Sequence, residues 1–308
     1  MTAESGELTE LSDEFALVEQ TAAEAGVAGN GLPRVRRAWV NVPAGGHVSG
    51  VFWGNGQPEV VFLHDIAESA RAWDAVALAL GRPSVAIDLP GHGRSDWRRD
   101  GRYEPGKLAS AIGEAIRSFA PRTRLVVGDG LGGRTALALR RRQRRLVARL
   151  VLLNTLPGPE PAPAQGWPGP ERFASPADAL AVLEVRRQER SAQSVRRETR
   201  YELSQNEDGS WAWRHHPGNL PPPAAGIGDA GAAEEALWEE LALLGSGAVL
   251  IRDGRTYPLP VPRLAWLRER VPEAQLITIS DAGTDVVGTQ PAALAAALDQ
   301  LLQPEEQP

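Results

Sequence analysis

Short apolar segments alternate with amphipathic segments along most of the chain. The apolar segments are rich in Val, Leu and Ile, which is typical of strands buried on both faces of a parallel sheet. The amphipathic segments carry apolar residues three or four positions apart, which is the spacing of one helix face. Alternating strands and helices predict the α/β class, with a doubly wound, mostly parallel sheet. The predicted strands are 59–64, 84–88, 125–128, 147–153, 248–251 and 275–279, and the predicted helices are 67–80, 108–119, 134–142 and 291–302.

The same pattern divides the chain into four parts. A β-hairpin is predicted at 35–42 and 47–53, where two alternating segments flank a Gly-containing turn. Helices are predicted at 176–187 and 191–203, followed by a tight hairpin around Asp208-Gly209, and the regular alternation of strand and helix is lost there. The predicted parts are an acidic N-terminal extension (1–33), a first core segment (34–156), an inserted, largely helical cap (157–245) and a second core segment (246–308).

Composition and charge narrow the possible functions. The chain has 308 residues, no cysteine and a formal net charge of −6 at pH 7. The absence of cysteine excludes disulfides, a thiolate nucleophile and cysteine-ligated metals. The negative charge disfavours nucleic acid as a partner, and no apolar run approaches the about 18 residues that a membrane span requires. The acidic opening also lacks the apolar segment of a secretory signal, so we expect a cytoplasmic protein without membrane or nucleic-acid partners. The sequence leaves the oligomeric state open.

A glycine-rich turn lies at 125–133, which reads Leu-Val-Val-Gly-Asp-Gly-Leu-Gly-Gly. An apolar run, a glycine cluster and a helix-forming stretch together predict a strand that turns sharply into a helix. Such a turn brings backbone close to backbone, so it requires small residues at Gly128 and Gly132. Gly130 lies at the apex, where no side chain is available to attack a substrate.

Three further motifs accompany this turn in a fixed order along the chain. Phe62-Leu-His64-Asp65 ends one strand, Asp88-Leu-Pro-Gly-His-Gly-Arg-Ser95 follows the next, and Asp281-Ala-Gly-Thr284 follows the last. With these motifs the chain resembles the α/β-hydrolase superfamily, in its capped esterase-like and epoxide-hydrolase-like form. The resemblance covers roughly residues 35–303 and implies the α/β-hydrolase fold, with an active site at the glycine-rich turn.

The resemblance also implies a Ser-His-Asp triad, and the chain departs from that pattern at every position. The family's serine nucleophile falls at Gly130, and its histidine falls at Thr284. Past the strand at 248–251 the first acidic residue is Asp253, which is earlier than the family's acid, and the alternative acid position holds Asn154. Because this chemistry needs nucleophile, base and orienting acid together, we expect a protein that has abandoned hydrolysis.

Two aspartates are gained beside the glycine apex. Asp65 stands where the family has the glycine of its oxyanion loop, and Asp129 directly precedes the apex. Neighbouring carboxylates repel each other and burial disfavours their charge, so one of the two can keep its proton and form an acid/base pair with the other. The alternative interpretation is that both aspartates face solvent or cap helices. Asp129 as a direct nucleophile is disfavoured, because Val127 and Leu131 would then occupy the positions that need small residues.

The remaining candidate residues are expected around the same pocket. The backbone N–H groups of Ile66 and Leu131 are expected to converge as an anion hole. Trp211 and Trp213 form either an aromatic wall for a flat ligand or the anchors of their hairpin. The pair His215-His216 offers a displaced base, but its spacing does not predict a metal site. The predicted catalytic residues are Asp129 and Asp65, and the predicted substrate-binding residues are His64, Ile66, Gly130, Leu131, Trp211, Trp213, Tyr257 and Thr284.

Two functions follow from this interpretation. The first is a non-hydrolytic, cofactor-independent enzyme that catalyses cyclisation, isomerisation or elimination of an apolar, polyketide-like biosynthetic intermediate, as non-hydrolytic members of the superfamily do. The second is a catalytically inactive binding, sensor or partner protein that uses the same pocket. Both predict a small apolar organic ligand, and neither requires a cofactor or a metal.

Overall fold

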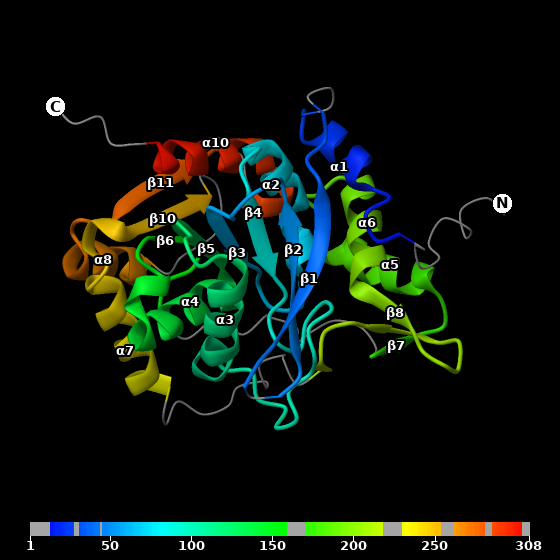
Figure 1. Ribbon diagram of the computed structural model, residues 1–308, viewed down its shortest axis with the longest axis horizontal. Helices are drawn as coiled ribbons and strands as arrows, with labels where there is room; N and C mark the ends of the chain where they lie inside the picture. The colour runs from blue at the N-terminus through cyan, green and yellow to red at the C-terminus, as the bar shows by residue number, and fades with distance from the viewer. Residues whose placement is uncertain are drawn as a thin grey trace.

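An eight-stranded sheet organises the molecule (Figure 1). The computed structural model describes residues 13–27, 31–43, 45–158, 171–217, 230–253, 261–280 and 285–303. The strand order is β1-β2-β4-β3-β5-β6-β10-β11, and only the pairs β1-β2 and β2-β4 are antiparallel. This confirms the predicted doubly wound, mostly parallel sheet. The strands are β1 (Val35–Asn41), β2 (His47–Trp53), β3 (Val60–Leu63), β4 (Ser84–Ile87), β5 (Leu125–Asp129), β6 (Leu150–Leu153), β10 (Ala248–Asp253) and β11 (Gln275–Ile279).

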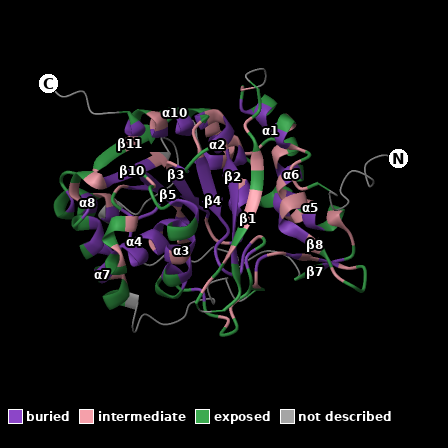
Figure 2. Ribbon diagram, in the orientation of Figure 1, coloured by how far each residue is buried: buried purple, intermediate pink, exposed green. Residues whose placement is uncertain are grey.

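Helices cover both faces of the sheet and bury its central strands (Figure 2). Side chains of β3 alternate between the two faces, as the two-residue period of a strand requires. Val61 and Leu63 join one apolar cluster, whereas Val60 and Phe62 join the other. The first cluster includes side chains of α3 (Pro105–Phe119), α4 (Gly130–Arg142), α7 (Ala230–Ala242) and α8 (Val261–Arg270), and the second includes those of α1 (Val18–Glu24), α2 (Asp74–Leu80), α9 (Val286–Thr289) and α10 (Pro291–Leu302).

The predicted helix at 67–80 is divided in the structure. Ala67 has a φ of 59°, a left-handed conformation that a helix interior does not accommodate. The chain then forms a 3-10 turn, η2 (Ala70–Trp73), before α2 begins at Asp74. Two further 3-10 turns, η3 (Arg144–Leu146) and η5 (Gly245–Gly247), precede β6 and β10.

A small separate unit lies beside the sheet, at the right of Figure 1. It contains α5 (Pro176–Arg186), α6 (Ala192–Glu202) and the three-stranded sheet β7-β9-β8, formed by Arg172–Phe173, Trp211–Trp213 and Leu203–Gln205. The predicted helices and the hairpin around Asp208-Gly209 are therefore present. The unit has its own apolar core and lies within the range 157–245 that is predicted to form a cap. The boundaries of 157–245 stay a prediction, and α7, which falls inside them, packs against α4 of the sheet domain.

The described part of the N-terminal extension packs against the rest of the protein. Val18 and Ala22 of α1 are buried against the face of the sheet that carries α2. Glu24 accepts two hydrogen bonds from Arg197 of α6, at 2.9 and 3.0 Å. The helix therefore connects the sheet domain to the cap.

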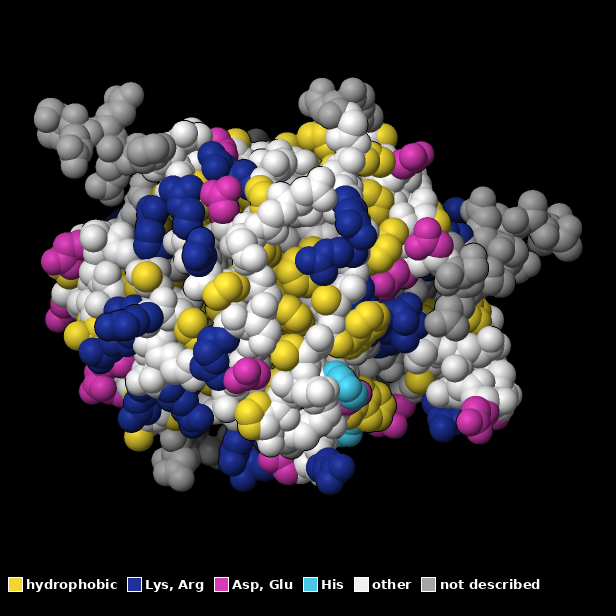
Figure 3. Space-filling view, in the orientation of Figure 1, with side chains coloured by type: hydrophobic (Ala, Val, Ile, Leu, Met, Phe, Trp, Pro, Cys, Tyr) yellow, Lys and Arg dark blue, Asp and Glu magenta, His cyan; other side chains and the backbone are white. Residues whose placement is uncertain are grey.

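The surface carries both signs of charge. On the face shown in Figure 3, Lys and Arg side chains form separate groups, with acidic and apolar side chains between them. Within the described ranges, no helix combines the length and the apolar character needed to cross a bilayer.

Candidate active site

The turn between β5 and α4 has the close packing that its glycines predict. A Cβ atom at Gly128 would lie 2.5 Å from Gly133, and a Cβ atom at Gly132 would lie 2.3 Å from the carbonyl oxygen of Leu63. Side chains at these positions would collide with backbone, which cannot move without separating the strand from the helix. The strand-turn-helix geometry expected from 125–133 is thus present.

The position left empty by Gly130 is filled by the side chain of Asp65. Gly130 has a φ of 41°, and a Cβ atom built on it would lie 1.8 Å from Oδ1 of Asp65 and 2.1 Å from its Cγ. The Leu131 N–H at the start of α4 donates a hydrogen bond of 2.8 Å to the same Oδ1 atom. A carboxylate therefore stands where the nucleophile side chain of the resembled family would stand, and the predicted anion-binding N–H of Leu131 holds it.

Asp129 is half-buried at the end of β5, directly before this turn. It is the N-cap residue of α4, but its side chain makes no capping hydrogen bond, so the helix-cap alternative fails for Asp129. Asp65 does fit that alternative, because it accepts a hydrogen bond from the Leu131 N–H in the first turn of α4. Burial raises the pKa of Asp129 well above its usual range, and the negative charge of Asp65 raises it further. Glu68 and Asp285 act in the same direction, whereas Arg187 opposes them. These surroundings favour the protonated form of Asp129.

An ion-pair network from the cap lies next to these two carboxyl groups. Arg187 follows α5 and pairs with Glu68 at 2.5 Å and with Glu198 of α6 at 3.0 Å. Arg190 pairs with Glu198 at 2.7 Å and also with Asp285. Burial alone would raise the pKa of Asp285, but the two arginines lower it to about 2. This network could not be predicted from the sequence, because no periodicity or motif links residues so far apart in the chain.

His64 is a buried structural residue, which corrects its prediction as a substrate contact. Its Nε2 accepts a hydrogen bond of 2.9 Å from the Leu89 N–H, and its Nδ1 lies 2.7 Å from the carbonyl oxygen of Asp65. Both ring nitrogens are therefore engaged inside the protein, and burial lowers the pKa of the ring so that it stays neutral. His64 fixes the backbone of the loop that carries Asp65, and Ile66 follows there as a half-buried residue.

The two cap tryptophans have the second of their two predicted roles, as anchors of the hairpin. Trp211 and Trp213 are buried in the core of the cap with Phe173, where they anchor the hairpin. The aromatic-wall prediction is corrected accordingly. His215 is buried beside Trp213, and burial lowers its pKa to about 3, so it is neutral and poorly suited to act as a base near neutral pH.

Two predicted site residues, Tyr257 and Thr284, lie outside the described residues, as does Asp281. Among the described residues, no group of three or more His, Cys, Asp or Glu side chains is arranged to hold a metal ion.

Comparison with known proteins shows which family the chain belongs to. The sequence pattern of the Alpha/beta hydrolase family matches residues 60–297, which is more than half of the chain. The chain belongs to the alpha/beta hydrolase family. The match includes the loop of Asp65, the turn at Gly130 and the cap, so the resemblance inferred from the sequence motifs is confirmed.

Within the alpha/beta hydrolase family, the chain is similar to esterases. It is 32% identical over 299 residues to Esterase Rv0045c of Mycobacterium tuberculosis, covering 94% of this chain and 95% of that protein. A crystal structure of that esterase superposes with a TM-score of 0.80, at 31% identity, over 96% of this chain and 99% of that one. A shorter match, 36% identical over 118 residues, links 36% of this chain to 44% of a pimeloyl-[acyl-carrier protein] methyl ester esterase of Aromatoleum aromaticum.

These relatives correct the predicted function. A relative that matches nearly the whole chain at 32% identity is an esterase, so the expectations of a non-hydrolytic enzyme and of a catalytically inactive hydrolase relative are wrong. The expectation rested partly on the missing side chain at Gly130, and in the structure the carboxylate of Asp65 occupies that space.

Proposed function

We propose that this protein hydrolyses small, apolar carboxylic esters, with Asp65 and Asp129 as its catalytic residues. The observation that carries the proposal is the position of the Asp65 carboxylate over Gly130, where a nucleophile side chain would otherwise stand. The similarity to Esterase Rv0045c over 94% of the chain supports ester hydrolysis as the reaction class.

The two carboxyl groups have environments that favour different protonation states. The Leu131 N–H donates to Asp65, and the N-terminal end of the α4 dipole favours a negative charge at that point. Asp129 has a raised pKa because it is partly removed from water and lies near the charge of Asp65. One ionised and one protonated carboxyl group at a shared site form an acid/base pair.

This pair can hydrolyse an ester with water as the nucleophile. Asp65 accepts a proton from water as the water oxygen bonds to the ester carbonyl carbon, and Asp129 donates its proton to the carbonyl oxygen. The Leu131 N–H is already occupied by Asp65, so Asp129 takes the place of an oxyanion-hole donor. When the tetrahedral intermediate collapses, the carbonyl oxygen returns its proton to Asp129. The carbon–oxygen bond to the alcohol breaks, and the departing alcohol takes the proton that Asp65 received from water, which restores both carboxyl groups.

A kinetic comparison of three variants tests this proposal. The purified protein is assayed with p-nitrophenyl acetate and p-nitrophenyl butyrate across pH 4 to 9. We expect turnover by the unaltered protein, and a decrease of about 10²- to 10⁴-fold in kcat/KM for Asp65→Asn and for Asp129→Asn. Asp208→Asn is the matched control, because Asp208 is exposed at the tip of the cap hairpin.

Two measurements separate this reaction from serine catalysis. A fluorophosphonate reagent, which modifies activated serines, should leave the activity unchanged, because the turn holds glycine at its apex. The rate should show a bell-shaped pH dependence, since Asp65 must be ionised and Asp129 protonated. Absence of turnover, full activity of Asp65→Asn, or complete inactivation by the fluorophosphonate would each refute the proposal.

A further inference from the structure

A small pocket lies where the N-terminal extension, the sheet domain and the cap meet. Its lining comes from the segment before α1, from β1, from the loops that follow β3 and β4, from α6 and from the residue after β9. Its volume is about 20 Å³, above the about 10–15 Å³ that one water-sized guest requires. Neither Asp65 nor Asp129 belongs to its described lining, so the pocket does not depend on the proposed esterase function.

The described lining of this pocket is strongly basic. Five arginines line it, and Glu14 is the one carboxylate beside them. Like charges that gather in one place repel each other, which favours an occupant of the opposite charge. The arginines come from separate segments of the chain, and they are Arg37, Arg71, Arg94, Arg200 and Arg214.

Two of these arginines are compensated within the protein. Arg37 pairs with Glu14 at 2.9 Å and with Asp88 at 2.6 Å, and Arg94 pairs with the same Glu14 at 3.1 Å. Nε of Arg37 also donates hydrogen bonds to both oxygens of Glu14. The carboxylate in the lining is therefore fully engaged and leaves no site for a cation.

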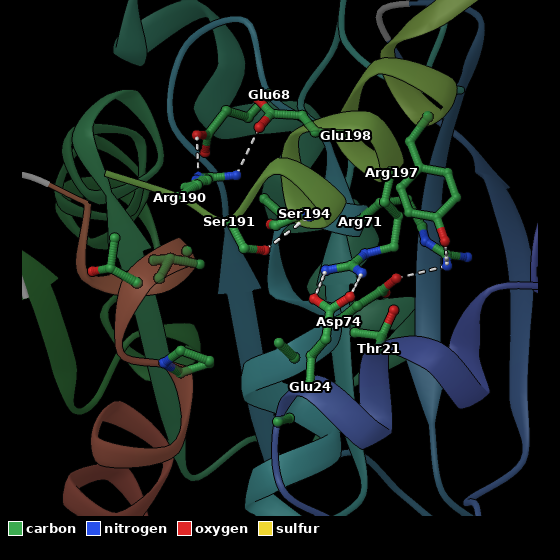
Figure 4. A pocket seen from close by; sticks show the side chains of 18 of the residues that line it. Thr21, Glu24, Glu68, Arg71, Asp74, Arg190, Ser191, Ser194, Arg197 and Glu198 are labelled. Carbon is green, nitrogen blue, oxygen red and sulfur yellow. Dashed lines mark hydrogen bonds and ion pairs between the residues drawn. The ribbon is translucent and has the colours of Figure 1, made fainter. Parts of the chain in front are cut away.

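Donor groups of two other arginines have no acceptor. Nε and Nη1 of Arg71 and Nε of Arg200 are buried without a hydrogen-bond partner. Arg71 pairs through Nη2 with Asp74 at 2.6 Å, where both side chains line a larger neighbouring cavity (Figure 4). The side chain of Arg200 makes no ion pair with any described residue. Buried donors without acceptors are costly, and on cationic groups they call for an acceptor that carries negative charge.

Tyr201 supplies one more donor to the same pocket. Its hydroxyl oxygen accepts a hydrogen bond of 2.8 Å from Nη2 of Arg71, whose guanidinium lies 4.1 Å from the centre of the Tyr201 ring. Burial raises the pKa of Tyr201 to about 12, so the hydroxyl keeps its proton, and no described acceptor receives that proton. Ser69, by contrast, already donates to Glu202 at 2.5 Å. The contact between Arg71 and Tyr201 places their donor groups side by side.

We propose that this pocket binds one small inorganic anion, of the size of chloride, between Arg71, Arg200 and Tyr201. A water molecule also fits the volume, but it brings no negative charge to a basic lining. The anion joins α6 of the cap, which carries Arg200 and Tyr201, to the loop after β3, which carries Arg71. It therefore fastens the cap to the sheet domain.

Chloride NMR spectroscopy tests this proposal on the full chain, at pH 7.5 in sodium gluconate. Exchange with a protein site broadens the chloride signal, so we expect excess broadening that saturates as sodium chloride is added. Arg200→Met keeps an unbranched side chain but removes its charge and donors, and it should weaken chloride binding by about tenfold or more. Arg196→Met is the matched control, because Arg196 is exposed on the same helix and lies outside the pocket.

A second variant keeps the test valid if Arg200→Met disturbs folding. Tyr201→Phe removes only the hydroxyl group and should also weaken chloride binding. Circular dichroism establishes that each variant is folded. The proposal is refuted if the broadening does not saturate, or if folded Arg200→Met or Tyr201→Phe binds chloride as tightly as the unaltered protein. Displacement of chloride by an equal concentration of phosphate also refutes it, because an oxyanion of that size exceeds the volume of the pocket.

Discussion

A double-mutant cycle can measure the steric overlap between a side chain at position 130 and the carboxylate of Asp65. Gly130→Ala alone places a Cβ atom within 1.8 Å of the Asp65 carboxylate, at a φ of 41° that favours glycine. The left-handed backbone costs about 1–2 kcal/mol, and the overpacking adds about 1–3 kcal/mol. Asp65→Gly alone removes a hydrogen bond between the Leu131 N–H and a charged group, worth about 1.5–3 kcal/mol.

In the double variant the steric part of the cost disappears, because the carboxylate is no longer there to be overpacked. We therefore expect Gly130→Ala with Asp65→Gly to be more stable than the sum of the single effects by about 1–3 kcal/mol. Urea denaturation at pH 7 measures these free energies of unfolding. Gly106→Ala combined with Asp65→Gly is the control cycle, since nothing lies within 4 Å of a Cβ atom at Gly106. Additivity within about 0.5 kcal/mol in the test cycle would show that the Asp65 carboxylate does not occupy this space.

Three further outcomes follow from the buried charges. Because the pKa of Asp129 is raised in the folded protein, the stability that Asp129 contributes is fully present below its unfolded pKa and is lost as pH rises through its folded pKa. Asp129→Asn should remove this loss of stability in thermal denaturations measured across pH. An unchanged dependence of stability on pH would contradict the raised pKa of Asp129. For Glu202 the stability is lost between its ordinary pKa of 4.5 and its raised pKa of about 8. At pH 9 we therefore expect Glu202→Gln to be more stable than the unaltered protein by up to about 5 kcal/mol in urea denaturation. Equal stability of the two proteins at pH 9 would contradict the raised pKa of Glu202. Arg197→Met removes both hydrogen bonds to Glu24 that attach α1 to the cap, so limited proteolysis should cut the chain near α1 faster, and unchanged cleavage would show that apolar packing alone holds the helix.

Much of the fold could be predicted because its signals are local. The apolar runs at β3, β5 and β10 are buried strands, as their composition indicates, and the three glycines at 128, 130 and 132 define the sharp turn. The helix predicted at 67–80 was less accurate, since the left-handed conformation of Ala67 depends on how the loop after β3 packs. The site could be predicted only in part. The positions of Asp65 and Asp129 beside the turn could be predicted from the motifs. The partners of His64 and the cap network of Arg187 depend on tertiary contacts that no sequence spacing reveals.

A side chain that is missing at one position of the chain can be replaced in space by a side chain from another position. Gly130 has no side chain, so the sequence alone indicates that the nucleophile of the family is missing. In the folded protein a Cβ atom at Gly130 would lie 1.8 Å from Oδ1 of Asp65, a residue 65 positions earlier in the chain. The Leu131 N–H, directly after the apex, donates a hydrogen bond to the same oxygen. The two departures from the family pattern are thus one structural change, because a side chain at position 130 and a carboxylate at position 65 cannot occupy the same volume. A glycine at the apex is therefore compatible with the hydrolytic activity of the relatives, provided that Asp65 and Asp129 together activate water.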